Sequence, residues 1–116
     1  MLPKEDAVRL YHMLESAREA IGYARDRTRK DLETDRQLSH SLVRCLEIIG
    51  EAARNISKES RDANPQIAWI DMIGMRNRLI HAYFDVDLDI VWKTVNKELP
   101  PLAAQIEPIL KAEGMI

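Results

Sequence analysis

Apolar side chains recur every three or four residues in four stretches of the chain, separated by polar segments. The first stretch follows Pro3 and ends in the basic run Arg25–Lys30, and the second opens at Thr34. The third covers Trp69–Phe84, and the fourth begins after Asp87. This spacing is that of one face of an α-helix, so the sequence predicts four amphipathic helices. The first two apolar faces are Ala7, Leu10, Leu14, Ala17, Ile21 and Ala24, then Leu38, Leu42, Cys45, Ile49, Ala52 and Ile56.

Capping residues and proline define where the first two predicted helices begin. Pro3 with acidic neighbours predicts the start of the first helix. Thr34-Asp35-Arg36-Gln37 has the spacing of a capping box and predicts the start of the second. Ser57 to Pro65 is polar and predicts a loop, with room for a short helical turn.

The fourth helix is expected to begin at an aspartate, with Asp85 or Asp87 as its N-cap. Pro100 and Pro101 remove two backbone donors and predict a kink or break. The apolar phase continues across them at Leu88, Val91, Val95, Leu99, Leu102, Ile106 and Ile109. Both halves should therefore pack on the same core.

The four patterns, with short connections and no strand pattern, predict an all-α, up-and-down bundle of four to five helices. With 4 Gly and 5 Pro, the 116 residues are too poor in turn formers for a turn-rich all-β protein. There are no repeats or composition shifts, so residues 1–116 are expected to form a single domain.

Composition excludes several classes of function. The net charge of −2 argues against a protein that coats nucleic acid, although it leaves room for a local basic site. A single cysteine, Cys45, permits no internal disulfide, and no apolar run approaches the roughly 18 residues of a membrane span. A cytoplasmic setting fits best. His12, His40 and His81 lack metal-binding spacing, so no metal or cofactor is expected.

The third stretch carries the polar residues that need an explanation. On a continuous helix of about 100° per residue, Arg76 falls at the centre of the apolar stripe. That stripe comprises Trp69, Met72, Ile73, Leu79, Ile80 and Tyr83. A buried guanidinium needs a partner, for which Glu47 and Glu51 are candidates. Asn77 and His81 share a neighbouring stripe at i, i+4 spacing.

These residues are sufficient for metal-free cleavage of RNA. Arg76 offers a rigid donor fork for a phosphate, and His81 can move a proton near neutral pH. They are about 140° apart on a straight helix, so one helix does not easily direct both to one phosphate. Either the helix distorts near its end, or the pair acts with its mate across a two-fold axis.

Simpler interpretations remain open for each residue. The role of Arg76 could be no more than an ion pair within the bundle. His81 could be a hydrogen-bonded structural residue, and Tyr83 could pack in the core. Ile48 and Gly50 stand on the polar side of the second helix, either as ordinary surface residues or as the point of close approach by a second subunit.

The run Arg76-Asn77-Arg78-Leu79-Ile80-His81-Ala82-Tyr83 resembles the Arg, four residues, His, one residue, Tyr signature of HepT-like toxins in the HEPN superfamily. Leu46-Glu47-Ile48-Ile49-Gly50-Glu51-Ala52 resembles the second-helix segment of that family. The resemblance extends over nearly the whole chain.

The resemblance implies a HEPN-like helical homodimer with its active cleft between subunits. It implies a toxin of a type II toxin–antitoxin system that cleaves tRNA or mRNA without a metal. Arg76 and His81 would be catalytic, and Asn77 and Glu51 would support the site. A minimal nucleotidyltransferase antitoxin would transfer AMP to Tyr83. The alternative is a non-catalytic helical partner, or a nucleotide-binding module, in complex with such a nucleotidyltransferase.

Overall fold

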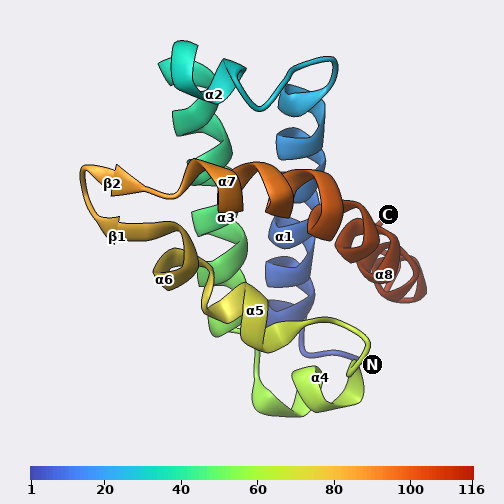
Figure 1. Ribbon diagram of the computed structural model, residues 1–116. Coiled ribbons are helices and arrows are strands. Elements are labelled where there is room, and N and C mark those ends of the chain that lie inside the picture. The colour runs from blue at the N-terminus through green and yellow to red at the C-terminus, as the bar shows by residue number, and fades with distance from the viewer.

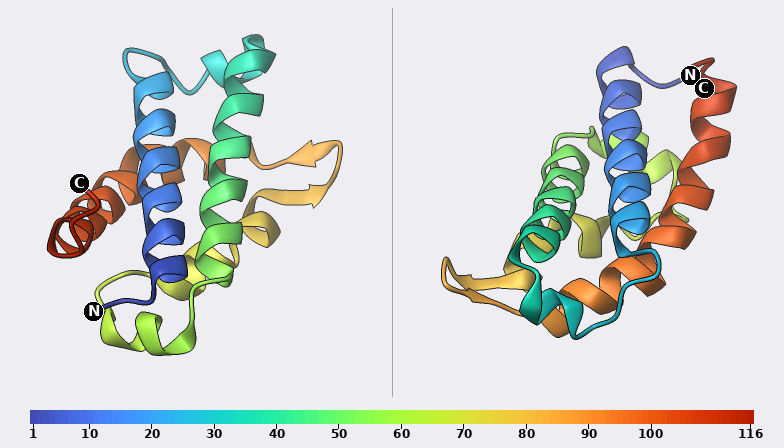
Figure 2. Two further views of the ribbon diagram at one scale, coloured as in Figure 1. Left: turned by 180° about the vertical axis from the view of Figure 1, so that it is seen from behind. Right: turned by 90° about the horizontal axis from the view of Figure 1, so that it is seen from above.

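The computed structural model describes all 116 residues and is mostly helical (Figure 1). Helices α1 and α3 run side by side in opposite directions and form the centre of the molecule (Figures 1 and 2). The predicted all-α class is confirmed, with a two-stranded hairpin as its one departure. The elements are α1 (Lys4–Ala24), α2 (Asp31–Thr34), α3 (Arg36–Arg54), α4 (Lys58–Ala63), α5 (Trp69–Ile73), α6 (Met75–Leu79), β1 (Ile80–Ala82), β2 (Asp85–Val86), α7 (Leu88–Lys93), η1 (Thr94–Glu98) and α8 (Leu99–Ala112).

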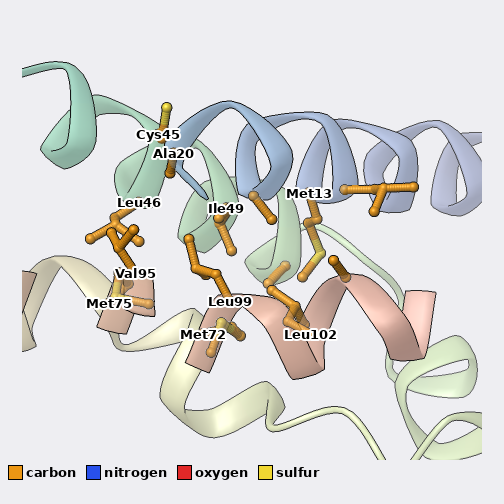
Figure 3. Close-up of a cluster of buried hydrophobic side chains, with 14 of the residues drawn as sticks. Met13, Ala20, Cys45, Leu46, Ile49, Met72, Met75, Val95, Leu99 and Leu102 are labelled. Atoms are coloured by element: carbon orange, nitrogen blue, oxygen red, sulfur yellow. The ribbon is translucent and has the colours of Figure 1, made fainter. Parts of the chain in front are cut away.

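The core is built where α5, α6 and the C-terminal helices pack on the α1–α3 pair. Figure 3 shows Met13 of α1, Ile49 of α3 and Met72 of α5 in one cluster with Leu99 and Leu102 of α8. All five side chains are almost fully buried. The buried face of α1 is rich in alanine (Ala7, Ala17, Ala20 and Ala24), which lets neighbouring helices approach closely. None of the helices combines the length and apolar character needed to cross a bilayer.

The C-terminal arm, formed by α7, η1 and α8, confirms the predicted helical phase. Its residues Val91, Val95, Leu99, Leu102 and Ile106 are all buried in the same core. The predicted disturbance takes the form of a π-helical turn, η1, placed just before Pro100 at the start of α8. Proline is tolerated there because the first N–H groups of a helix have no intrahelical partner. The arm therefore changes direction without leaving the core (Figure 2).

Aspartates cap two of the helices, α3 and α7. Asp35, not Thr34, is the N-cap of α3, and its Oδ1 accepts from the Leu38 N–H at 3.1 Å. The predicted Thr34 capping box is wrong because Thr34 belongs to the preceding short helix α2. Asp87 caps α7 by accepting from the Ile90 N–H at 3.1 Å, which confirms one of the two expected N-caps.

A buried carboxylate joins the start of α1 to the start of α4. Asp6 is 3% exposed, and it accepts hydrogen bonds from the Ser57 N–H at 3.0 Å and from the Ser57 and Ser60 hydroxyls at 2.6 Å each. Burial raises the pKa of Asp6, but these hydrogen bonds outweigh it, so its pKa lies below the ordinary value. The short helical turn for which the sequence left room is thus helix α4, held to the bundle by Asp6.

The single helix predicted across Trp69–Phe84 is wrong. The chain bends at Gly74 between α5 and α6, and the helix ends at Leu79. Ile80 then adopts extended dihedrals, and the Leu79 carbonyl accepts from the Asp87 N–H at 2.8 Å. β1 pairs antiparallel with β2, which satisfies backbone groups that a longer helix would have paired internally.

Candidate active site

Arg76 lies on the surface of α6, which corrects the expectation of a buried guanidinium. Its side chain is 74% exposed, and its Nη1 is 3.9 Å from Glu47 Oε2 on α3. The bend at Gly74 changes the helical phase, so Met72, Met75 and Leu79 take the buried positions and Arg76 turns outward. A guanidinium in this position is hydrated and remains available to a ligand.

Gly50 explains how α6 comes so close to α3. A Cβ added at Gly50 would lie 3.0 Å from the Met72 carbonyl oxygen and 3.2 Å from the Met75 Cβ. Gly50 is therefore buried against α5 and α6 of its own chain, and it does not mark the approach of a second subunit. Ile48, by contrast, remains half-buried on α3.

A polar pocket of about 320 Å³ lies between α3 and α6, and we call it the α3–α6 pocket. Its charged lining consists of Arg44, Glu47, Glu51, Arg54 and Arg76. Glu51, expected to support the site, is therefore in the same pocket as Arg76. Its Oε1 accepts from Asn55 Nδ2 at 3.2 Å, one turn along α3. The pocket thus places the exposed Arg76 guanidinium beside two carboxylates and two further arginines of α3.

His81 stands on β1, where the strand register shifts between Ile80 and Ala82. Such a bulge redirects a side chain at the edge of a hairpin. The ring is 55% exposed, and its Nδ1 lies 3.6 Å from Asp85 Oδ2 on β2. At this distance Asp85 can form an ion pair with a protonated ring, and Nε2 has no hydrogen-bond partner within the chain.

The sequence reasoning missed Asp85 as a partner of His81 and considered it only as an N-cap. The only signal was a two-residue connection between Ile80–Ala82 and Asp85–Val86, and its residues Tyr83 and Phe84 are not the Gly, Asn or Asp typical of such a turn. It was hidden because the same residues continue a helical pattern from Trp69.

Tyr83 occupies the tip of the hairpin together with Phe84. The Tyr83 side chain is 93% exposed and packs edge-to-face on Phe84, with ring centroids 5.2 Å apart. Its ring is not part of the apolar stripe, which corrects the expected placement. The hydroxyl is accessible, as modification by another protein requires.

The remaining polar residues of α6 differ in their surroundings. Asn77 is exposed beside Arg76 and forms no side-chain hydrogen bond within the chain. Arg78 instead binds Glu98 of η1 through two hydrogen bonds of 2.8 and 3.1 Å. The hydrogen bonds to Glu98 raise the pKa of Arg78, which stays charged in this pair. Arg78 therefore fastens α6 to the C-terminal arm and is not free for a substrate.

Arg76 and His81 lie on consecutive elements, α6 and β1, on one side of the molecule (Figure 1), but His81 is not among the residues that line the α3–α6 pocket. Each has its own carboxylate, Glu47 for Arg76 and Asp85 for His81. Of the two geometries expected from the sequence, the helix does change course before His81, because α6 ends at Leu79.

Cys45 is buried, and burial raises the pKa of its thiol to about 11, so it is an unreactive core residue.

Comparison with known proteins assigns the chain to a family. The family described as "Ribonuclease HepT-like" matches residues 13–109. The chain belongs to the HepT-like ribonuclease family. This membership confirms the resemblance seen at Arg76–Tyr83 and Leu46–Ala52.

Several proteins named as ribonucleases match most of the chain. A protein of Thermococcus cleftensis named as a probable ribonuclease HepT is 40% identical over 102 residues, covering 84% of this chain and 93% of the relative. A protein of Caldanaerobacter subterraneus subsp. tengcongensis named as a candidate RNase is 39% identical over 104 residues, covering 90% and 93%. A third, from Methanocaldococcus jannaschii and also named as a candidate RNase, is 37% identical over 98 residues, covering 84% and 90%. No solved structure gives a significant match.

Proposed function

We propose that this HepT-like protein is an endoribonuclease that cleaves RNA without a metal ion, through Arg76 and His81. The observation that carries the proposal is that two consecutive elements present an exposed, loosely paired Arg76 on α6 and an exposed His81 on β1, with Asp85 Oδ2 3.6 Å from His81 Nδ1. A histidine oriented by a carboxylate can transfer protons, and a free guanidinium can bind a phosphate.

The chemistry follows from the atoms each residue leaves free. His81 Nε2 takes the proton of a ribose 2′-hydroxyl as its oxygen attacks the adjacent phosphorus, and a proton is returned to the leaving 5′-oxygen. The products are a 2′,3′-cyclic phosphate and a 5′-hydroxyl. Arg76 offsets the negative charge that develops on the non-bridging oxygens. Asn77 and Glu51 support the site, Asn77 with a free amide and Glu51 from within the α3–α6 pocket.

The biological setting is also part of the proposal. The chain would act as the toxin of a type II toxin–antitoxin system in the cytoplasm, with tRNA or mRNA as substrate and two copies forming a homodimer. A minimal nucleotidyltransferase would neutralise it by adding AMP to Tyr83. The exposed hairpin tip supports this, because its hydroxyl is open to another enzyme.

Cleavage of RNA in the presence of EDTA tests the proposal. The purified protein should degrade total RNA or tRNA, and His81→Ala should reduce the rate by about 10²- to 10⁴-fold, the usual contribution of an acid–base residue. His40→Ala is the matched control, because His40 is an exposed histidine on α3 and should leave the rate unchanged. Cleavage by His81→Ala at the wild-type rate would show that the mechanism is wrong. Loss of all activity in EDTA would exclude the metal-free route.

A further inference from the structure

We propose that Arg44 and Arg54 of α3 bind backbone phosphates of single-stranded RNA on either side of the phosphate held by Arg76. This inference rests on the proposed ribonuclease function. It assigns the α3–α6 pocket to the path of the substrate and gives α3 a direct part in binding.

The first support is the free state of these two arginines. Arg18, Arg27, Arg29 and Arg78 each have a carboxylate oxygen within 2.9 Å, whereas Arg9, Arg25, Arg36 and Arg61 have none and lie outside the α3–α6 pocket. Arg44 and Arg54 have no ion pair or side-chain hydrogen bond, although Glu47 and Glu51 line the same pocket. Their donor groups are therefore unused and hydrated. An unpaired, planar guanidinium is well suited to contact a phosphate.

The second support is the arrangement of charge along α3. Arg44, Glu47, Glu51 and Arg54 follow one another at three- and four-residue steps, so they lie along one face of the helix. Ten residues separate Arg44 from Arg54, which corresponds to about 15 Å along the helix axis. That separation suits contacts with two different phosphates better than with one. Arg76 faces the middle of this row, next to Glu47.

The two carboxylates only partly offset the three guanidinium groups of the pocket. Glu47 Oε2 lies near Arg76, and Glu51 Oε1 accepts from Asn55. With three guanidinium groups and two carboxylates, the pocket carries one net positive charge. The chain as a whole is negative, so the attraction for RNA is local to this pocket. Such weak, local attraction favours a short single-stranded segment over extended duplex.

Salt-dependent binding of an uncleavable probe tests the inference. The probe is a fluorescent, single-stranded oligonucleotide whose riboses are all 2′-O-methylated, so that no 2′-hydroxyl can attack. Its affinity is measured by fluorescence anisotropy between about 50 and 200 mM salt. Each lost phosphate contact should reduce the slope of log affinity against log salt by about 0.7. Arg44→Gln and Arg54→Gln should each do so, and the double variant should lose about 1.4.

Arg36→Gln is the matched control, because Arg36 is an exposed, unpaired arginine at the start of the same helix and outside the pocket. It should leave the slope unchanged. If Arg44→Gln and Arg54→Gln behave like Arg36→Gln, or if the wild-type protein does not bind the probe, the inference is overturned. RNA cleavage in EDTA is scored separately. A wild-type protein that cleaves RNA while all three variants bind alike would overturn only the inference, whereas reduced slopes without any cleavage would overturn only the ribonuclease function.

Discussion

At the residue scale, two arginines on the same short helix have different roles. Arg76 is 74% exposed, with one carboxylate oxygen at 3.9 Å, whereas Arg78 is 30% exposed and forms two hydrogen bonds with Glu98. An exposed, distant ion pair contributes little to stability, but a half-buried, bidentate pair contributes measurably. Substitution of Arg76 should therefore affect mainly catalysis, and substitution of Arg78 should affect mainly stability.

We predict that Arg76→Ala lowers the rate of RNA cleavage by about 10²- to 10³-fold while the free energy of unfolding changes by less than about 0.5 kcal/mol. Arg78→Ala should instead lower the free energy of unfolding by about 1–2 kcal/mol, because it leaves Glu98 without its partner. Urea denaturation and cleavage assays on both variants measure the two effects. A large loss of stability in Arg76→Ala would mean that this guanidinium is buried in an assembly.

The exposed Tyr83 hydroxyl gives a second prediction at this scale. Incubation with a cognate nucleotidyltransferase and ATP should add AMP-sized masses to Tyr83, and the added phosphates should repel RNA from the neighbouring basic site and silence cleavage. Tyr83→Phe should escape modification and keep its fold, because the hydroxyl forms no hydrogen bond within the chain. Intact-mass and peptide mass spectrometry decide the outcome. An unmodified Tyr83 beside an active partner would rule out this control without affecting the ribonuclease proposal.

At the element scale, the position of α6 depends on a glycine in the neighbouring helix. Gly50 lets the α5–α6 segment lie directly against α3, and this contact forms the pocket that Arg76 lines. The bend at Gly74 and the end of α6 at Leu79 then turn the chain into the hairpin that carries His81. The site is thus set by one close helix contact and one change of secondary structure.

We predict opposite effects for two Gly→Ala substitutions. Gly50→Ala should lower the free energy of unfolding by about 1 kcal/mol, because the cost of overpacking against Met72 and Met75 exceeds the gain in helix propensity. Gly22→Ala is the control in α1, where the added Cβ has nothing within 4 Å, and it should raise the free energy of unfolding by about 0.5–1 kcal/mol. Thermal or urea unfolding measures both. Equal stabilisation by the two substitutions would contradict the close contact.

At the scale of the whole molecule, the surface retains exposed apolar side chains that one copy does not cover. Ile70 is 88%, Tyr83 93% and Phe84 78% exposed, and Ile48 is half-buried on α3. Gly50 no longer belongs to this surface, since it is covered within its own chain. Burial of apolar side chains favours association of two copies about a two-fold axis.

We predict that the protein is a homodimer at micromolar concentration. Sedimentation equilibrium should give twice the mass of the chain, and dilution should not yield monomer until well below that concentration. A clean monomer would contradict this prediction and the expected cleft between subunits. It would leave the cleavage chemistry of Arg76 and His81 to be tested in one chain.

The hydrophobic pattern of the sequence was sufficient to predict the helical class and most of the buried core residues. Leu42, Ile49, Val95 and Leu99 are buried as their spacing predicts, because a helical period fixes which face is apolar whatever the packing. The motif was also sufficient to identify the HepT-like family. Arg76, His81 and Tyr83 could be selected as candidates from their chemistry and spacing alone.

Only the tertiary structure decided how those candidates are presented. A helical wheel assumes a continuous helix, but the bend at Gly74 and the hairpin after Leu79 moved Arg76 out of the core and Tyr83 to an exposed tip. The pairing of His81 with Asp85 follows from strand register. The pocket that joins Arg76 to α3 depends on a contact between residues distant in the sequence. The period of a sequence reports which residues prefer burial, whereas the ends of helices depend on backbone hydrogen bonds that tertiary neighbours complete.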